Sequence, residues 1–188
     1  MQKIRLAGPL QTDSIVDGPG IRAVLWTQGC GHHCEGCHNP ETHDFHGGSN
    51  YDVEQIKKQL DTLQFHDGIT LSGGDPMFQP EACYEIAKYA QKKGLNVWCY
   101  TGFTLEQLLV MSHKNKWILK LLEQIDVMVD GKFELSQKSL NLKFKGSRNQ
   151  RILNVPKSLK QHQAVIIEKY NREKTWSPIY KQEEYLYI

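Results

Sequence analysis

The segment Ile21–Cys37, IRAVLWTQGCGHHCEGC, joins an apolar run to three closely spaced cysteines. The run up to Thr27 is rich in β-forming side chains and stops before Gly29, which predicts a buried strand. After it we expect a loop rich in Gly, His and Asn that extends to about Gly48. The spacing C-x3-C-x2-C places three thiols at the start of that loop, those of Cys30, Cys34 and Cys37.

Downstream of this loop, helical and strand patterns alternate along the chain. The helical spacing of apolar residues predicts helices over residues 51–63, 80–93, 104–111 and 117–124. Short β-rich runs predict strands over residues 68–71, 95–100, 125–129 and 151–155. Strands separated by helices indicate βαβ units and a mostly parallel sheet.

The length of the chain limits the number of such units. A βαβ unit takes about 30 residues and a closed eight-stranded barrel typically about 250, whereas this chain has 188. We therefore expect an α/β fold of about five to six mostly parallel strands, as an open, partial barrel or a doubly wound sheet. The strand–helix rhythm fades after Pro156, so we expect one domain over residues 1–156 and a C-terminal extension of unknown role over 157–188.

In both architectures, functional residues gather at the C-terminal ends of the strands. The sequence places a distinctive segment at each predicted end. The cysteine loop follows the first strand, and three further segments follow the next three: Ser72-Gly-Gly-Asp-Pro76, Tyr100-Thr-Gly-Phe103 and Val129-Asp-Gly-Lys-Phe133.

The overall composition excludes several classes of protein. With 39% hydrophobic and 23% charged residues, the chain is typical of a globular domain rather than a disordered one. A formal net charge of +2 gives no sign of a nucleic-acid partner. No window approaches the ~20 apolar residues of a membrane span, and no secretory signal is recognised. We therefore expect a cytoplasmic protein with reduced thiols and with neither nucleic acid nor membrane as a partner.

Three thiols in one loop admit several interpretations. A structural zinc site needs four ligands, so the fourth would be a nearby histidine. An iron–sulfur cube normally takes four thiolates, and three would leave one iron free for a non-protein ligand. The segment Cys34–His38 also has the C-x-x-C-H spacing of c-type haem attachment. The candidate histidines are His32, His33, His38, His43 and His46.

Haem attachment and a redox-active dithiol are less consistent with the sequence than a metal centre. Haem attachment requires export, for which no signal is seen, and a redox dithiol would leave the third cysteine without a role. Cys83 lies in a predicted helix and Cys99 in a predicted strand. We expect both to be small buried hydrophobic residues.

A cysteine motif of this spacing after the first strand, followed by a Gly-Gly-acidic turn after the second, resembles the radical S-adenosylmethionine superfamily. Four segments are similar to the activases of glycyl-radical enzymes: Asp17-Gly-Pro-Gly-Ile-Arg22, Thr27-Gln-Gly-Cys30, Cys37-His-Asn-Pro40 and Ser72-Gly-Gly-Asp-Pro76. Two later segments resemble the activating proteins of anaerobic ribonucleoside-triphosphate reductase: Val129-Asp-Gly-Lys-Phe133 and Phe144-Lys-Gly-Ser-Arg-Asn-Gln-Arg151. The resemblance covers roughly residues 14–155.

Two departures from the superfamily pattern narrow the resemblance. Most members carry an aromatic residue just before the third cysteine, whereas this chain has Gly36. The reductase activators are similar in having glycine there. The chain also lacks the second set of cysteines that some larger activases carry in an insertion.

The resemblance implies a partial β/α barrel and an oxidoreductase that uses a [4Fe–4S] cluster and S-adenosylmethionine. One electron, from a donor such as flavodoxin or ferredoxin, cleaves S-adenosylmethionine, and the 5′-deoxyadenosyl radical takes a hydrogen atom from a glycine of the reductase. The three thiolates of Cys30, Cys34 and Cys37 would bind three irons, and the fourth iron would chelate the amino and carboxylate groups of S-adenosylmethionine. No catalytic side chain is expected beyond the cluster and the cofactor.

The resemblance also assigns contacts with S-adenosylmethionine. Adenine contacts are expected from Gly36, Cys37 and His38. The turn Gly73-Gly74-Asp75 is expected to bind the methionine part, because a residue without Cβ lets the backbone approach a ligand. Ribose contacts are expected from Thr101 and Gly102.

Two polar segments could have either a functional role or only a structural one. Asp17–Gly20 would shape the entry of a substrate peptide or form an ordinary turn. The polar residues before the last strand would hold a carboxylate or the partner, or form a solvated turn: Arg148, Asn149 and Arg151.

Three alternative functions stay open. The segments Thr42-His-Asp44 and Cys37-His-Asn-Pro40 favour an activating enzyme of the pyruvate formate-lyase type. A small-molecule enzyme of the 7-carboxy-7-deazaguanine synthase type would share the short chain and the partial barrel. A zinc-stabilised binding module is the alternative that is not an enzyme.

Overall fold

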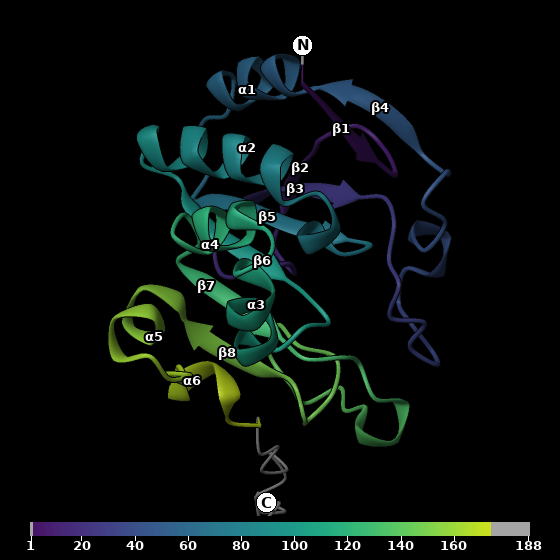
Figure 1. Ribbon diagram of the computed structural model, residues 1–188, viewed down its shortest axis with the longest axis vertical. Coiled ribbons are helices and arrows are strands. Elements are labelled where there is room, and N and C mark those ends of the chain that lie inside the picture. Colours follow the sequence, from purple (N-terminus) through teal and green to yellow (C-terminus); the bar gives the residue numbers. More distant parts are fainter. Residues whose placement is uncertain (1, 174–188) are drawn as a thin grey trace, which may run out of the picture.

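The computed structural model describes residues 2–173 (Figure 1). Within that range, eight strands form one sheet in the order β4-β1-β3-β5-β6-β7-β8, and β2 pairs with β3 beside β1. The strands are β1 (Lys3–Leu6), β2 (Gln11–Ser14), β3 (Arg22–Thr27), β4 (Ser49–Asp52), β5 (Gly68–Gly73), β6 (Asn96–Tyr100), β7 (Val127–Asp130) and β8 (Arg151–Asn154).

The four central strands β3, β5, β6 and β7 are parallel, and the strands around them pair antiparallel. In the described part of the chain, the sheet ends at β4 on one side and at β8 on the other, so it does not close. The prediction of an α/β fold with a parallel centre and an open barrel is confirmed. The sheet has more strands than expected because β1, β2 and β4 are only four residues long, too short for a periodic apolar pattern to mark them.

Helices cover one face of the sheet, where Figure 1 shows α1–α4 stacked along its side. Alternate strand residues such as Ile69, Leu71, Val97 and Met128 pack into this main core. The opposite residues of the strands face the inside of the open barrel, because successive side chains point to opposite faces of a strand. The helices are α1 (Val53–Asp61), α2 (Pro80–Lys92), α3 (Leu105–Ser112), α4 (Lys116–Leu122), α5 (Val155–Gln161) and α6 (Glu168–Asn171).

The helix starts follow local sequence signals. Asp52 caps α1 by accepting a hydrogen bond from Glu54 N, and Pro80 lies in the first turn of α2. Thr104 and Gln107 form a capping box at the start of α3. The predicted helix over 51–63 begins later, at Val53, because the preceding residues pair with β1 as β4.

The expected boundary at residue 156 falls inside α5, which begins at Val155. After α5 the chain returns along β8, where Asn154 N donates to Val165 O at 2.9 Å and Ile167 N donates to Ile152 O at 2.9 Å. Residues 157–173 therefore pack on the edge of the sheet. The rest of the expected extension, 174–188, lies outside the described residues.

None of the helices in residues 2–173 combines the length and the apolar character that crossing a membrane requires.

Candidate functional site

An open pocket of about 390 Å³ lies at the C-terminal ends of the parallel strands. Its walls come from the cysteine loop after β3, from the ends of β5 and β6, and from the segment between β7 and β8. Eight of the ten predicted site residues line it: Cys30, Cys34, Cys37, His38, Gly73, Gly74, Thr101 and Gly102. Gly36 and Asp75 are not part of the lining, and of the two only Asp75 is buried.

The cysteine loop is held by backbone hydrogen bonds to its own later part. Gly29 N donates to Thr42 O at 2.8 Å, and Cys30 N donates to His43 O at 3.1 Å. Cys30 is buried, whereas Cys34 and Cys37 are half-buried. The three thiols thus lie on one wall of the pocket, at positions that the loop backbone sets.

The three thiols do not surround a single ion. In the part of the chain that the structure describes, no three His, Cys, Asp or Glu side chains converge as ligands of one metal ion. The three thiols nevertheless line one open pocket, and an iron–sulfur cube held by three thiolates would keep one iron for a non-protein ligand, so the residues present fit such a cluster.

Burial changes the acidity of these thiols. It raises the pKa of Cys30 to about 11 and raises that of Cys34 less strongly, because the thiolate is poorly solvated there. Thiols bind metal as thiolates, so binding of a metal centre would release their protons. Burial raises the pKa of Cys83 and Cys99 too, and both are fully buried in the main core away from the pocket.

The turn after β5 is packed against protein backbone on its hidden side. A Cβ on Gly74 would lie 2.5 Å from Gly29 O and 2.9 Å from Thr42 O. Gly73 has a φ of +98°, and its Cβ would lie 2.5 Å from Thr27 N. Both positions therefore require glycine, because the turn packs closely against the backbone of the cysteine loop and of the end of β3. This requirement is independent of any contact with a ligand.

Asp75 is fully buried and its carboxylate accepts four hydrogen bonds from the protein. Oδ1 accepts from Met77 N at 2.9 Å. Oδ2 accepts from Thr101 Oγ1 at 2.8 Å, from Gly102 N at 2.9 Å and from His32 Nε2 at 2.7 Å. Since a carboxylate has about four acceptor sites, this one is occupied by protein donors and has little capacity left for a ligand.

The segment between β7 and β8 forms another part of the pocket lining. His38 packs against Phe133 with ring centroids 4.9 Å apart. Gly36 has a φ of +69°, and a Cβ there would lie 3.0 Å from Leu135 Cδ1. The left-handed backbone conformation at position 36 favours glycine, whereas the exposed Leu135 side chain could shift to make room for a Cβ.

Polar side chains of the Asp17–Gly20 segment and of the segment before β8 form hydrogen bonds within the protein. Asp17 lines the pocket, and it accepts a hydrogen bond from Ser14 Oγ at 2.5 Å. Arg148 Nε donates to Glu173 Oε1 at 2.9 Å, and Asn149 Nδ2 donates to Lys132 O at 2.8 Å.

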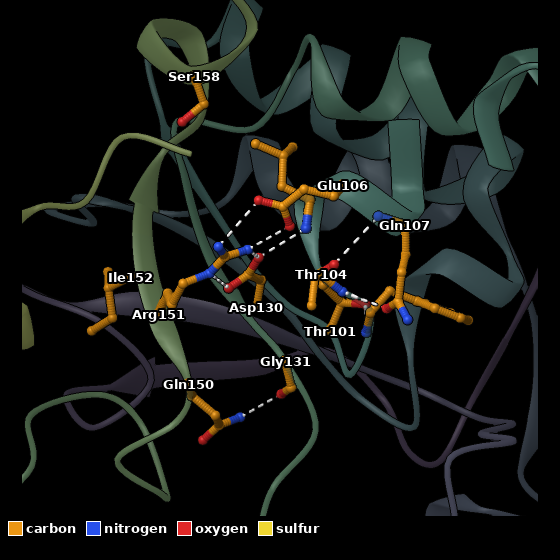
Figure 2. A network of polar contacts seen from close by, with 12 residues as sticks. Thr101, Thr104, Glu106, Gln107, Asp130, Gly131, Gln150, Arg151, Ile152 and Ser158 are labelled. Atoms are coloured by element: carbon orange, nitrogen blue, oxygen red, sulfur yellow. Dashed lines mark hydrogen bonds and ion pairs between the residues drawn. The ribbon is translucent and has the colours of Figure 1, made fainter. Parts of the chain in front are cut away.

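Arg151 is the centre of an ion-pair network beside the pocket, drawn in Figure 2. Its guanidinium donates to both oxygens of the buried Asp130 and of the exposed Glu106. Asp130 Oδ2 also accepts from Leu105 N at 2.8 Å, which holds the start of α3 against the end of β7. Arg151 therefore joins elements of the protein and does not face a ligand.

The sequence does not predict several pocket residues as contacts of a cofactor. They include Tyr100, Phe144, Lys145 and Gln150, together with His32, which the sequence suggests only as a possible metal ligand. Gln150 holds one wall together: its Nε2 donates to Gly131 O at 3.0 Å (Figure 2), and its Oε1 accepts from Gly146 N at 2.8 Å. The segment that contains it was recognised as a motif, but only the structure shows which of its side chains line the pocket.

Comparison with known proteins agrees with this site. Residues 16–153 match a family described as a 4Fe-4S single cluster domain. Proteins named anaerobic ribonucleoside-triphosphate reductase-activating protein are similar over most of their length. The one from Escherichia coli K12 is 37% identical over 145 residues, 72% of this chain and 90% of the relative. The one from bacteriophage T4 is 33% identical over 147 residues, 73% of this chain and 86% of the relative.

Among solved structures, QueE from Escherichia coli aligns with 54% of this chain and 53% of its own, at a TM-score of 0.44 and 12% identity. That likeness is too weak to carry an argument about the fold or the site.

Proposed function

This chain belongs to the family of anaerobic ribonucleoside-triphosphate reductase-activating proteins, and we propose that it activates such a reductase by generating a radical on one of its glycines. A [4Fe–4S] cluster with bound S-adenosylmethionine would supply the one-electron cleavage and the abstraction of a hydrogen atom from that glycine. The observation that carries the proposal is that the three thiols and the Gly73–Gly74 turn line one open pocket.

The residues of the chain divide this work among them. Cys30, Cys34 and Cys37 hold the cluster on one wall of the pocket. Gly73 and Gly74 offer backbone groups to the methionine part of S-adenosylmethionine, since no side chain covers them. The protein supplies position and exclusion of water, and the cofactor supplies the bond cleavage.

The contacts with the rest of S-adenosylmethionine are also proposed. His38 and the backbone of Gly36 and Cys37 bind adenine, on the wall that Phe133 supports. Thr101 and Gly102 lie on the pocket lining for the ribose. Asp75 acts from behind the lining, because its carboxylate is occupied by protein donors.

The pocket is open to the outside, which suits a protein substrate that must insert a glycine-bearing loop. We propose an electron donor such as flavodoxin or ferredoxin and a cytoplasmic location, where the thiols stay reduced.

The test is anaerobic reconstitution with iron and sulfide, followed by incubation with S-adenosylmethionine, a reductant and the anaerobic reductase. We expect about four irons and four sulfides per chain, cleavage of S-adenosylmethionine, and a glycyl-radical signal in the reductase by electron paramagnetic resonance. Pyruvate formate-lyase is the matched control substrate, and it should stay without a radical. A chain that holds one zinc and no sulfide, or a radical on pyruvate formate-lyase alone, would overturn the proposal.

A further inference from the structure

His32 lies between the first two cysteines of the motif, and its side chain contacts Asp75, which follows the two glycines of the turn after β5. Its Nε2 lies 2.7 Å from Asp75 Oδ2, and its side chain is only 7% exposed. Because an ionised carboxylate only accepts hydrogen bonds, Nε2 donates this one. The ring also packs against Phe103, with centroids 4.4 Å apart.

The space for the ring is shaped by a neighbouring glycine. A Cβ on Gly102 would collide with the His32 ring. Gly102 N donates to the same Asp75 oxygen as His32 does. The ends of β5 and β6 and the cysteine loop therefore meet at one buried carboxylate.

Asp75 holds the cysteine loop through its backbone as well. Its N–H donates to Gly29 O at 3.0 Å, just before the first cysteine. The side-chain contact with His32 lies just after that cysteine. Cys30 is thus fixed on both sides by one residue of the glycine turn.

The loop bends sharply directly after this anchor. His33 has a φ of +51°, a conformation that costs free energy in a residue other than glycine. Such a conformation persists where the surrounding structure determines it. The buried contact of His32 with Asp75 supplies that constraint and directs the chain from Cys30 to Cys34.

We propose that His32 and Asp75 are a positioning pair, in which a buried hydrogen bond sets the distance between the first two cluster ligands and the S-adenosylmethionine-binding turn. This inference rests on the proposed function. Neither residue touches the reacting atoms; both act through the thiols and the turn. Partners of this kind behind metal ligands typically change metal affinity or activity about 10–100-fold when they are removed.

The experiment compares three variants by how fast the reconstituted protein loses iron to a chelator and by the resonance spectrum of its reduced cluster. His32→Leu keeps the volume and removes the donor, whereas His32→Gln keeps an N–H that reaches a similar position. His66→Leu is the control, since its side chain is also 7% exposed but lies before β5, away from the thiols.

We expect His32→Leu to lose iron about 10–100-fold faster and to change the spectral response to S-adenosylmethionine. His32→Gln should largely restore both, and His66→Leu should resemble the wild type. A wild-type rate and spectrum in His32→Leu, or an equal defect in His32→Gln and His32→Leu, would overturn the positioning role.

A double-mutant cycle keeps the test decisive if the His32→Leu variant also folds poorly. Asp75→Asn and the double variant Asp75→Asn/His32→Leu complete a cycle in which partners in one contact do not add. We expect the double variant to lose iron no faster than the worse single variant, and additive effects would contradict the pair. If the wild type itself binds no cluster, the proposed function fails together with this inference. If the wild type binds the cluster and His32→Leu behaves like it, only the positioning role fails.

Discussion

Arg151 on β8 and Asp130 at the end of β7 form a two-pronged ion pair, with Nε 2.9 Å from Oδ1 and Nη2 2.5 Å from Oδ2. Asp130 is fully buried, whereas the Arg151 side chain is 30% exposed. The two carboxylates beside it raise the pKa of Arg151 further above its usual value, so it stays charged. The pair binds the edge strand β8 to the last parallel strand next to the pocket.

Replacing Arg151 by leucine should destabilise the fold. The change leaves the buried Asp130 carboxylate without its charged partner, and we expect a loss of about 1.5–3 kcal/mol in the free energy of unfolding. Glu106→Gln, which removes the exposed charge on the same guanidinium, should cost less than about 1 kcal/mol. Urea unfolding at pH 7 measures both, and equal losses would contradict the assignment of Asp130 as the essential partner.

The contribution of Glu106 should depend on pH. Hydrogen bonds from Arg151 lower the pKa of Glu106 from 4.5 to about 2 in the folded protein. A depressed folded pKa stabilises the fold above the unfolded value and loses that effect as the pH falls. The stability difference between wild type and Glu106→Gln should therefore be constant above pH 4.5 and shrink toward pH 2. Urea unfolding across this range tests it; a difference that grows as the pH falls would show the opposite sign.

Gly74→Ala should be costly although the backbone conformation there is ordinary. Its Cβ would lie 2.5 Å from Gly29 O, and backbone atoms of the cysteine loop cannot move aside freely. Overpacking of this kind costs roughly 1–3 kcal/mol. Gly8→Ala is the control, because no atom lies within 4 Å of its Cβ, and it should change stability by less than about 0.5 kcal/mol. Chemical unfolding of the metal-free proteins compares them, and a harmless Gly74→Ala would disprove the close packing.

Cys34→Ala should abolish cleavage of S-adenosylmethionine while the fold persists. Cys34 is half-buried at the pocket, and a three-thiolate site has no spare ligand. Cys83→Ala, on α2 in the main core, should keep its bound iron. The measurement is iron content, cofactor cleavage and circular dichroism of each variant. Full cleavage activity in Cys34→Ala would refute the ligand assignment.

Asn171→Ala should loosen the segment that follows α5. Asn171 Nδ2 donates to Ile152 O at 2.9 Å, and its Oδ1 accepts from Ile152 N at 3.1 Å, so the side chain continues the hydrogen bonding of β8. Ile152 O keeps its hydrogen bond from Ile167 N, but leaving Ile152 N without its partner should cost roughly 1–3 kcal/mol. Arg172→Ala removes only an exposed ion pair with Glu168 and should have little effect. If the two variants unfold alike in urea, the segment does not depend on this side chain.

The local elements could be predicted well where a periodic apolar pattern marks them. The capping residue Thr104 and the first-turn residue Pro80 mark helix starts that the structure confirms. The sequence does not predict the strands β1, β2 and β4, because each has only four residues and β2 and β4 are largely exposed. Pairing partners at the edge of a sheet leave little periodic signal in the sequence.

The sequence predicts most residues of the candidate site, and the structure adds the contacts that they make with one another. The thiols and glycines share one pocket, as their positions at strand ends indicated. The contact of Asp75 with the cofactor stays a prediction, and the structure adds that its carboxylate joins β6 and the cysteine loop. His32 was considered only as a possible metal ligand, and the structure gives it a buried partner instead.

By itself, the sequence determined the cysteine spacing, the alternation of the parallel strands with helices, and the family of the chain, because motifs and apolar periodicity depend on neighbouring residues. The tertiary structure alone decided what each motif touches. Gly74 meets Gly29, and His32 meets Asp75, which lies 43 positions further along the chain. Contacts between residues so distant arise only when the parallel strands bring their C-terminal ends together, and packing at that edge decides which side chains face the ligand and which hold the walls.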